Sequence, residues 1–288
     1  MYEYGAVFTL VGPDGTTVIF NDGLSGLWLE EVTGFDSPNI RMNIEELPET
    51  DGAIAGDAWM GQRPVTLKGK IAGLSPTDRN AVLVSLQRAL RALRSDLTLM
   101  SQPSGLPAMQ VTARLDNFRY SGLFAKDFLI SVVCPDPGIY SQTVNTAAAT
   151  QAGTPATPGA EFPLAFPINF GGGGGAYAVL VSVTNGGNFT APAVFRVFGP
   201  IKNPQLTNAD TGESLYVDSI ELASGEWLDI DMGARTAVKS DGTSWYANVR
   251  FPASTWWLLP PGSTTVQLWG SGTTVETELG VYWRDTWC

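Results

Sequence analysis

The chain has 288 residues, 44% of them hydrophobic, with 32 glycines, 19 prolines and no histidine. This length allows a sizeable core and favours two domains, and the glycine and proline content indicates turn-rich β architecture, not a helical, fibrous or disordered protein. The 17 basic and 28 acidic residues give a net charge of −11, which argues against a nucleic-acid-binding surface of clustered Lys and Arg.

The first residues predict a β-hairpin and a third strand. Residues 6–20 place two apolar stretches on either side of Gly12-Pro13-Asp14-Gly15, with Pro at the second and Gly at the fourth turn position. A further strand is expected over Leu27 to Val32. No apolar run approaches the roughly 18 residues of a membrane span, so we expect neither a signal peptide nor membrane insertion.

A long excursion rich in Gly and Asp follows, from about residue 42 to residue 62. Because it contains few residues that could bury one another, we expect it to pack on something else. The strand that begins at Val65 alternates, with Val65, Leu67 and Ile71 on one face and polar residues on the other.

One amphipathic helix is predicted from Pro76 to about Arg94. Ser75 is its expected N-cap and Asp78 completes a capping box. The apolar residues that recur at helical spacing are Val82, Leu86, Leu90, Leu93 and Leu97.

Strands near Met109–Leu115 and Asp127–Cys134 complete a first domain over residues 1–140, and a linker is expected over 141–163. Residues 164–288 predict a β-sandwich of short strands. These strands are expected at Ala178–Thr184, Ala193–Phe198, Ser214–Ile220, Glu226–Met232, Ser244–Phe251, Thr264–Trp269 and Val275–Tyr282.

Few residues are candidates for chemistry. Without histidine the usual general base of nucleophile triads is missing. Asp229 and Asp231, which share a strand face with Trp227, are the best carboxylate pair for a glycosidase or a calcium site, although solvated strand carboxylates are the simpler interpretation. Cys134 and Cys288 make no disulfide framework, which fits folding in a reducing cytoplasm.

Seven of the nine tryptophans lie after residue 226. They serve either as core and interface packing or as a platform on which sugars stack. In the adjacent pair Trp256-Trp257, strand alternation buries only one ring. The candidate glycan platform consists of Trp227, Trp245, Trp256 and Trp257.

The order of turn motifs along the chain resembles that of the distal tail proteins of phages with long, non-contractile tails. The matching residues of the first domain are Gly34-Phe35-Asp36-Ser37-Pro38, Arg41, Asp51-Gly52, Gly61, Arg63 and Asp136-Pro137-Gly138-Ile139-Tyr140-Ser141. Those of the second domain are Asn185-Gly186-Gly187-Asn188, Ala191-Pro192, Gly199-Pro200-Ile201-Lys202-Asn203-Pro204, Asp210-Thr211-Gly212, Gly225-Glu226, Asp229-Ile230-Asp231, and Trp256 before Leu259-Pro260-Pro261-Gly262.

The resemblance implies a mainly β protein. Its N-terminal β-sandwich would carry one helix and an extended arm, and its C-terminal domain would be a galectin-like or carbohydrate-module-like β-sandwich (jelly roll). The family forms a hexameric ring in the virion tail that joins the tail tube to the baseplate and leaves a channel for DNA. The residues that the resemblance assigns to the arm and the hub are Asp36, Pro38, Arg41, Asp51, Gly52, Gly61 and Arg63.

The resemblance also implies partners and an absence of catalysis. The expected partners are further copies of the chain, the tail tube protein, the tape-measure protein and a tail-associated hub or tail fibre protein. Assembly would take place in the bacterial host cytoplasm, and DNA would pass an acidic lumen without specific binding. No catalytic residue, cofactor or metal is implied. A carbohydrate-binding adhesin for host surface glycans is the alternative that the tryptophan-rich sandwich keeps open.

Overall fold

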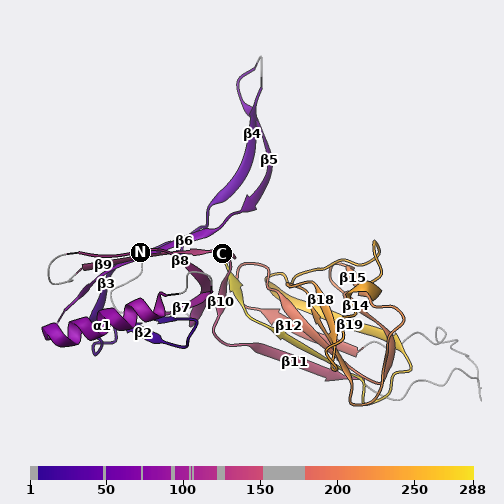
Figure 1. Cartoon of the computed structure of the whole chain (residues 1–288). Helices are drawn as coiled ribbons and strands as arrows, with labels where there is room; N and C mark the ends of the chain where they lie inside the picture. Colours follow the sequence, from indigo (N-terminus) through magenta and orange to yellow (C-terminus); the bar gives the residue numbers. More distant parts are fainter. Residues whose placement is uncertain are drawn as a thin grey trace, which may run out of the picture. The chain divides into compact units, whose positions relative to one another are not determined.

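The computed structural model describes residues 6–47, 50–72, 74–91, 95–103, 105, 107–121, 127–151 and 179–288. The chain divides into two compact units: unit 1 holds residues 1–143 together with Thr286–Cys288, and unit 2 holds Val144–Asp285 (Figure 1). Both units are built from strands, so the mainly β prediction is confirmed. Among the described residues, no helix has the length and apolar character needed to span a membrane.

Unit 1 contains one large sheet and one separate hairpin. The sheet has nine strands in the order β2-β1-β7-β8-β9-β6-β3, with β10 paired to β8 and β21 paired to β10. The strands of unit 1 are β1 (Val7–Val11), β2 (Thr17–Phe20), β3 (Leu27–Thr33), β4 (Ile40–Glu46), β5 (Ala53–Met60), β6 (Arg63–Ile71), β7 (Leu97–Gln102), β8 (Met109–Ser121), β9 (Asp127–Cys134), β10 (Ile139–Ser141) and β21 (Thr286–Trp287).

The sheet of unit 1 encloses its own core. The first part of β8 pairs with β7 and its second part pairs with β9, with a bulge between Leu115 and Asn117. The two halves face each other, since Phe20 of β2 contacts Phe128 of β9 with ring centroids 5.8 Å apart. Their buried side chains form one hydrophobic cluster, which gives unit 1 its sandwich character.

The first hairpin and the alternating strand lie where the sequence predicts them. Strands β1 and β2 flank a turn closed by the Gly15 amide, which donates to the Gly12 carbonyl at 3.0 Å. In β6, Val65, Leu67 and Ile71 are buried, while Lys68 and Lys70 are exposed and Thr66 is half-buried. The period of two therefore identifies the core face of this strand.

Helix α1 (Pro76–Ala89) begins as predicted and ends earlier than predicted. Ser75 caps it, with its Oγ accepting from the Asp78 amide at 3.2 Å. Leu90 is the C-cap, and the Arg91 amide donates to the Arg88 carbonyl, so the last turn tightens and the helix stops. Leu97, which continues the helical spacing past the predicted end of the helix, begins β7 instead, while Leu93 and Arg94 lie outside the described residues. A leucine of the next strand had matched the helical spacing by chance.

Unit 2 is a sandwich of two five-stranded sheets. One has the order β11-β20-β13-β17-β18, and the other has the order β12-β19-β14-β15 with β16 paired to β14. Side chains from both sheets form a single core. The elements are β11 (Asn145–Thr150), β12 (Val179–Asn185), β13 (Ala193–Phe198), β14 (Ile201–Asn208), β15 (Ser214–Tyr216), β16 (Glu221–Leu222), β17 (Trp227–Asp231), β18 (Thr236–Lys239), the 3-10 helix η1 (Tyr246–Asn248), β19 (Gly262–Ser271) and β20 (Glu278–Trp283).

Several segments of unit 2 differ from the sequence-based expectation, which also lacked strands β16 and β18. Residues 145–150, expected in a linker, form β11 because Ala147 and Ala149 pack on the core; the centre of that linker lies outside the described residues. Residues 244–251, expected as a strand, form η1 and a loop with only isolated bridges. Strand β14 was missed because Asn203-Pro204, a turn signal, sits in a bulge within the strand.

Candidate functional site

The excursion of unit 1 is a β-hairpin that stands away from the rest of the unit (Figure 1). Strands β4 and β5 form a two-stranded sheet, and every residue in both is exposed. At the described end of the turn the Leu47 amide donates to the Gly52 carbonyl at 3.2 Å, and Gly52 adopts a φ of 120° that favours glycine. We call residues 40–60 the arm.

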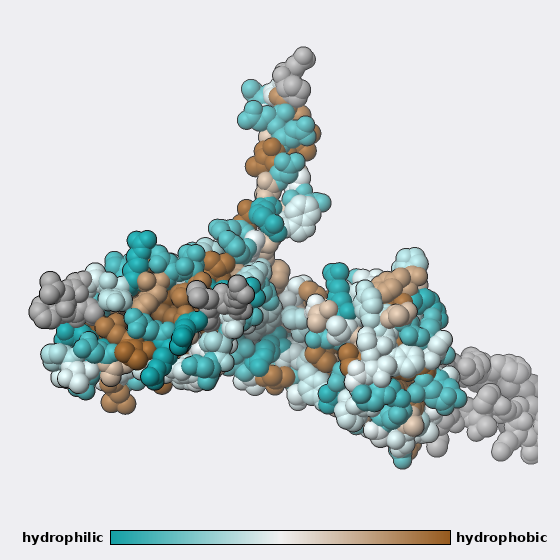
Figure 2. Space-filling model, viewed as in Figure 1, coloured by the Kyte–Doolittle hydropathy of each residue, from teal (hydrophilic) through white to brown (hydrophobic). Residues whose placement is uncertain are grey.

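The face of the arm that carries Ile40, Met42 and Ile44 is apolar over this stretch, and Glu46 follows these residues on the same face. The register pairs Ile40 with Met60, Met42 with Ala58 and Ile44 with Ala55, with a bulge in β5 that keeps these residues on one face. The opposite face carries Arg41, Asn43 and Glu45 beside Ile54 and Trp59. Hydrophobic residues gather along the arm in Figure 2. The first face, which we call the apolar arm face, has no polar side chain between residues 40 and 44 of β4.

A buried arginine holds the base of the arm. Arg63, the first residue of β6, is fully buried. Its Nε donates to the Pro137 carbonyl at 2.9 Å, and its Nη1 donates to the carbonyls of Gly34, at 2.9 Å, and Asp36. Two of these acceptors lie in the segment before the arm and the third lies in the loop before β10. Since Arg63 itself follows the arm, its guanidinium links the segments on both sides of the arm to the loop before β10.

The last residues of the chain complete this base. Strand β21 pairs with β10, and Trp287 packs against the core of unit 1. The Cys288 Sγ lies 3.6 Å from Arg63 Nη2 and 3.0 Å from the Met60 Sδ. Gly34 is required here because a Cβ at that position would stand 2.0 Å from the Pro64 carbonyl oxygen. Burial raises the pKa of the nearby Cys134 thiol to about 11, against the opposing effect of the Arg63 charge.

The residues that the resemblance assigned to the hub fall into two groups. Four of them are exposed: Asp36 lies before the arm, Arg41 lies on β4, and Asp51 and Gly52 lie at the described end of the turn. The other three are buried at the base of the arm, namely Pro38, Gly61 and Arg63. The Gly61 amide donates to the Asn39 carbonyl at 2.6 Å, which closes the hairpin. The second group therefore positions the arm. Sequence reasoning missed the apolar arm face, although Ile40, Met42 and Ile44 alternate with a period of two.

The carboxylate pair of β17 is occupied by local partners. Asp229 makes a bidentate ion pair with Arg196 of β13, at 2.6 and 2.9 Å, and the pKa of Arg196 is raised chiefly by this hydrogen bonding. Asp231 accepts from the Ala234 amide at 2.8 Å. Within the described part of the chain, no group of three His, Cys, Asp or Glu residues could hold a metal ion.

The four tryptophans proposed as a glycan platform occupy different environments. Trp257 is buried against Phe195, with ring centroids 5.0 Å apart, so its ring cannot meet a ligand. The Arg196 guanidinium covers Trp227, 5.3 Å from the ring centroid. Trp245 and Trp256 pack partly buried against the core. The prediction that one ring of the Trp256-Trp257 pair is buried is confirmed. Trp257 cannot belong to the predicted glycan platform, because its ring is part of the core.

Residues 186–287 match the profile of the siphovirus-type tail component, C-terminal domain. Most of unit 2 is thus similar to this tail component domain. The resemblance to distal tail proteins drawn from the turn motifs is confirmed by this match and by the shared fold described below. No curated protein sequence matches the chain.

Solved structures share the fold over nearly the whole chain. The crystal structure of the phage SPP1 Dit (gp 19.1) protein, described as a paradigm of hub adsorption apparatus in Gram-positive infecting phages, has a TM-score of 0.66 and 16% identity, covering 96% of this chain and 98% of that one. A chain of the phage P2 baseplate in its activated conformation with calcium has a TM-score of 0.53 and 10% identity, with coverages of 96% and 97%. A chain of the same baseplate with strontium has a TM-score of 0.51 and 11% identity, with coverages of 96% and 97%.

Proposed function

We propose that this protein is a distal tail hub that forms a homo-hexameric ring between the tail tube and the baseplate and leaves a channel for DNA. The tail component domain and the fold shared with a hub protein and with baseplate chains support this assignment. The tail tube protein, the tape-measure protein and a tail-associated hub or fibre protein are the proposed neighbours in the virion tail. Assembly in the host cytoplasm fits two cysteines that are not joined in a disulfide.

The observation that carries the proposal is the exposed arm. A two-stranded hairpin is at best marginally stable in water when it has no other surface to pack against. The apolar arm face exposes Ile40, Met42, Ile44 and Met60. Since complete burial of such a side chain contributes about 1.5–3 kcal/mol and these are about half exposed, covering them contributes roughly 4 kcal/mol per arm.

A second copy of the chain is the proposed occupant of the apolar arm face. An arm that contacts a different surface of its neighbour makes a head-to-tail interface, and such interfaces generate closed rings when the rotation between copies closes. Each copy would both extend an arm and receive one, so every apolar arm face in the ring would be covered. The net charge of −11 fits a lumen from which DNA is repelled.

Two isoleucines of the arm provide a matched test. Ile44 on the apolar arm face is 61% exposed and Ile54 on the opposite face is 60% exposed. We expect Ile44→Glu to reduce the mass of the assembly measured by light scattering, because a charge would be buried without a partner. Ile54→Glu should retain the assembly. Equal masses for both variants and the parent would show that the apolar arm face is not the interface.

We infer further that the protein is not an enzyme. The carboxylate pair that could have acted as a glycosidase is engaged by Arg196 and by the Ala234 amide. A glycosidase needs two carboxyl groups whose environments separate their pKa values and leave them free for a substrate. Detectable glycoside hydrolysis that disappears in Asp229→Asn would contradict this inference.

A further inference from the structure

Unit 2 displays a group of aromatic rings in the connection between β18 and β19. The rings of Tyr246 and Trp256 are nearly parallel, with an interplanar angle of 12° and centroids 6.2 Å apart. Phe251 is tilted at 48° to Tyr246 with centroids 5.9 Å apart. Tyr246 is 47% exposed and Phe251 is 51% exposed, whereas Trp256 packs partly against the core. We call these three residues the aromatic cluster.

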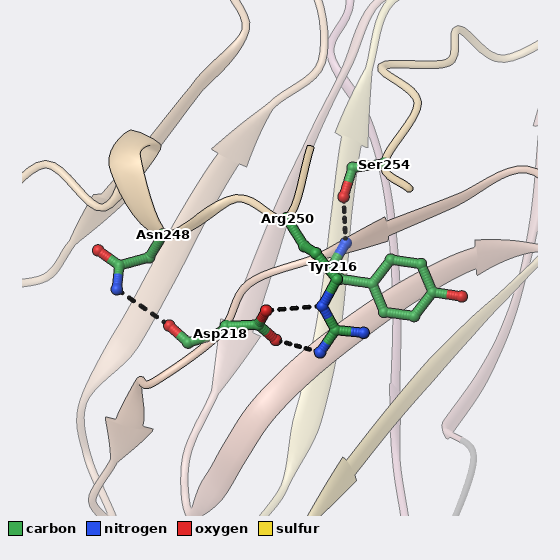
Figure 3. A network of polar contacts seen from close by, with 5 residues as sticks. All are labelled: Tyr216, Asp218, Asn248, Arg250 and Ser254. Carbon is green, nitrogen blue, oxygen red and sulfur yellow. Dashed lines mark hydrogen bonds and ion pairs between the residues drawn. The ribbon is translucent and has the colours of Figure 1, made fainter. Parts of the chain in front are cut away.

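The segment that carries the aromatic cluster is fixed by a polar network (Figure 3). Arg250 makes a bidentate pair with Asp218 and lies over the Tyr216 ring, 5.0 Å from its centroid. The Asn248 side chain donates to the Asp218 carbonyl at 3.1 Å, and the Ser254 Oγ accepts from the Tyr216 amide at 3.0 Å. Each anchor lies within a few residues of a ring of the cluster. The rings are therefore presented on a rigid loop.

The exposed area of the aromatic cluster suits a small ligand. An aromatic side chain buries about 150–250 Å² when covered, so the two half-exposed rings together offer roughly 200 Å². A stable protein interface buries about 800 Å² on each partner. A sugar unit, with a flat C–H face and a rim of hydroxyls, matches a ring surface of this size, and Tyr246 adds its own hydroxyl.

The charge of unit 2 restricts the ligand class. Residues 144–285 contain 6 basic and 12 acidic residues, a net charge of 6 − 12 = −6, and the cation nearest the cluster in sequence, Arg250, is already paired with Asp218. An anionic polymer would be repelled. We propose that the aromatic cluster is a binding site for a neutral saccharide, with Tyr246 and Phe251 stacking on the sugar ring and Trp256 supporting Tyr246 from behind.

This site is independent of the proposed ring, since it uses only residues of unit 2. The test titrates the full-length protein with maltotriose, chitotriose and polyglycerol phosphate, using saturation-transfer NMR to detect contact and calorimetry to measure the dissociation constant. We expect one of the two neutral trisaccharides to bind in the millimolar range typical of weak sugar sites, about −4 kcal/mol, and polyglycerol phosphate not to bind.

Three variants locate the site. Tyr246→Ala and Phe251→Ala should each weaken saccharide binding at least about tenfold, equivalent to about 1.4 kcal/mol. Tyr120→Ala, which removes an equally exposed aromatic (51%) from unit 1, should bind as the parent does. Thermal unfolding of each variant shows whether it is folded, and because two single variants are used, one unfolded protein does not remove the test.

The proposal is overturned if neither trisaccharide binds at about 20 mM, well above a millimolar dissociation constant. It is also overturned if folded Tyr246→Ala and Phe251→Ala bind like the parent, or if polyglycerol phosphate binds as well as the neutral sugars. Loss of contact with another tail protein in the cluster variants, with no saccharide binding in the parent, would instead assign the cluster to a protein partner. None of these outcomes depends on whether the ring forms.

Discussion

At the scale of single residues, Arg63 connects the fold to the arm. Its guanidinium is buried and is satisfied by the backbone carbonyls of Gly34, Asp36 and Pro137 and by the Cys288 sulfur. A lysine retains the charge but lacks the planar fork that reaches several acceptors at once. Arg63 therefore fixes the base of the arm, and we expect it to make no contact with a neighbouring copy of the chain.

We expect Arg63→Lys to reduce the free energy of unfolding by about 2 kcal/mol or more, because hydrogen bonds to a charged group contribute about 1.5–3 kcal/mol each. Urea unfolding provides the measurement. Arg114→Lys is the matched control: Arg114 also belongs to unit 1, but its pair with Asp96 is exposed, and such pairs contribute about 0–1 kcal/mol. Similar losses in the two variants would contradict the role assigned to Arg63.

At the scale of elements, the arm is expected to serve assembly and not folding. None of its residues belongs to the hydrophobic core of unit 1, and β4 and β5 pair only with each other among the described strands. Removal of Glu45 to Ala58 should leave the thermal unfolding midpoint nearly unchanged and abolish the assembly seen by light scattering. Global unfolding of the shortened protein would show that the arm is part of the core.

The elements that sequence reasoning predicted are those whose patterns are local. The alternation of Val65, Leu67 and Ile71 and the cap at Ser75 are each set by neighbouring residues. The elements that it missed depend on tertiary contacts. Strand β11 is made of small residues that become a strand only by pairing with β20, and the segment 244–251 is shaped by contacts with β15 and β18.

The candidate sites show the same division. The position of the arm follows from its few self-burying residues, and Arg63 and Gly61 follow from the resemblance. The apolar arm face could have been predicted, because Ile40, Met42 and Ile44 recur with a period of two in β4. The aromatic cluster could not, because Tyr246, Phe251 and Trp256 recur every five residues, a spacing that places side chains on one face of neither a helix nor a strand, and they are brought together by the network around Asp218 and Arg250. Composition favoured four tryptophans, of which Trp257 is buried in the core and Trp245 and Trp256 pack partly against it.

At the scale of the whole molecule, the two units supply separate properties. Unit 1 carries the arm and the residues that fix it. The first and the last of the described residues both belong to this unit. Unit 2 carries most of the stretch that is similar to the tail component domain, together with the aromatic cluster. A ring built through unit 1 can present one copy of unit 2 per subunit, and weak saccharide contacts repeated around a ring would gain strength from multivalency.

The measurement that tests the central claim most directly is the mass and shape of the purified protein, by light scattering and negative-stain imaging. We expect particles of about six copies with an open centre, as a closed ring requires. A protein that stays strictly monomeric at high concentration, and that also leaves the ends of purified tail tubes unbound, would contradict the proposal that this chain is a tail hub.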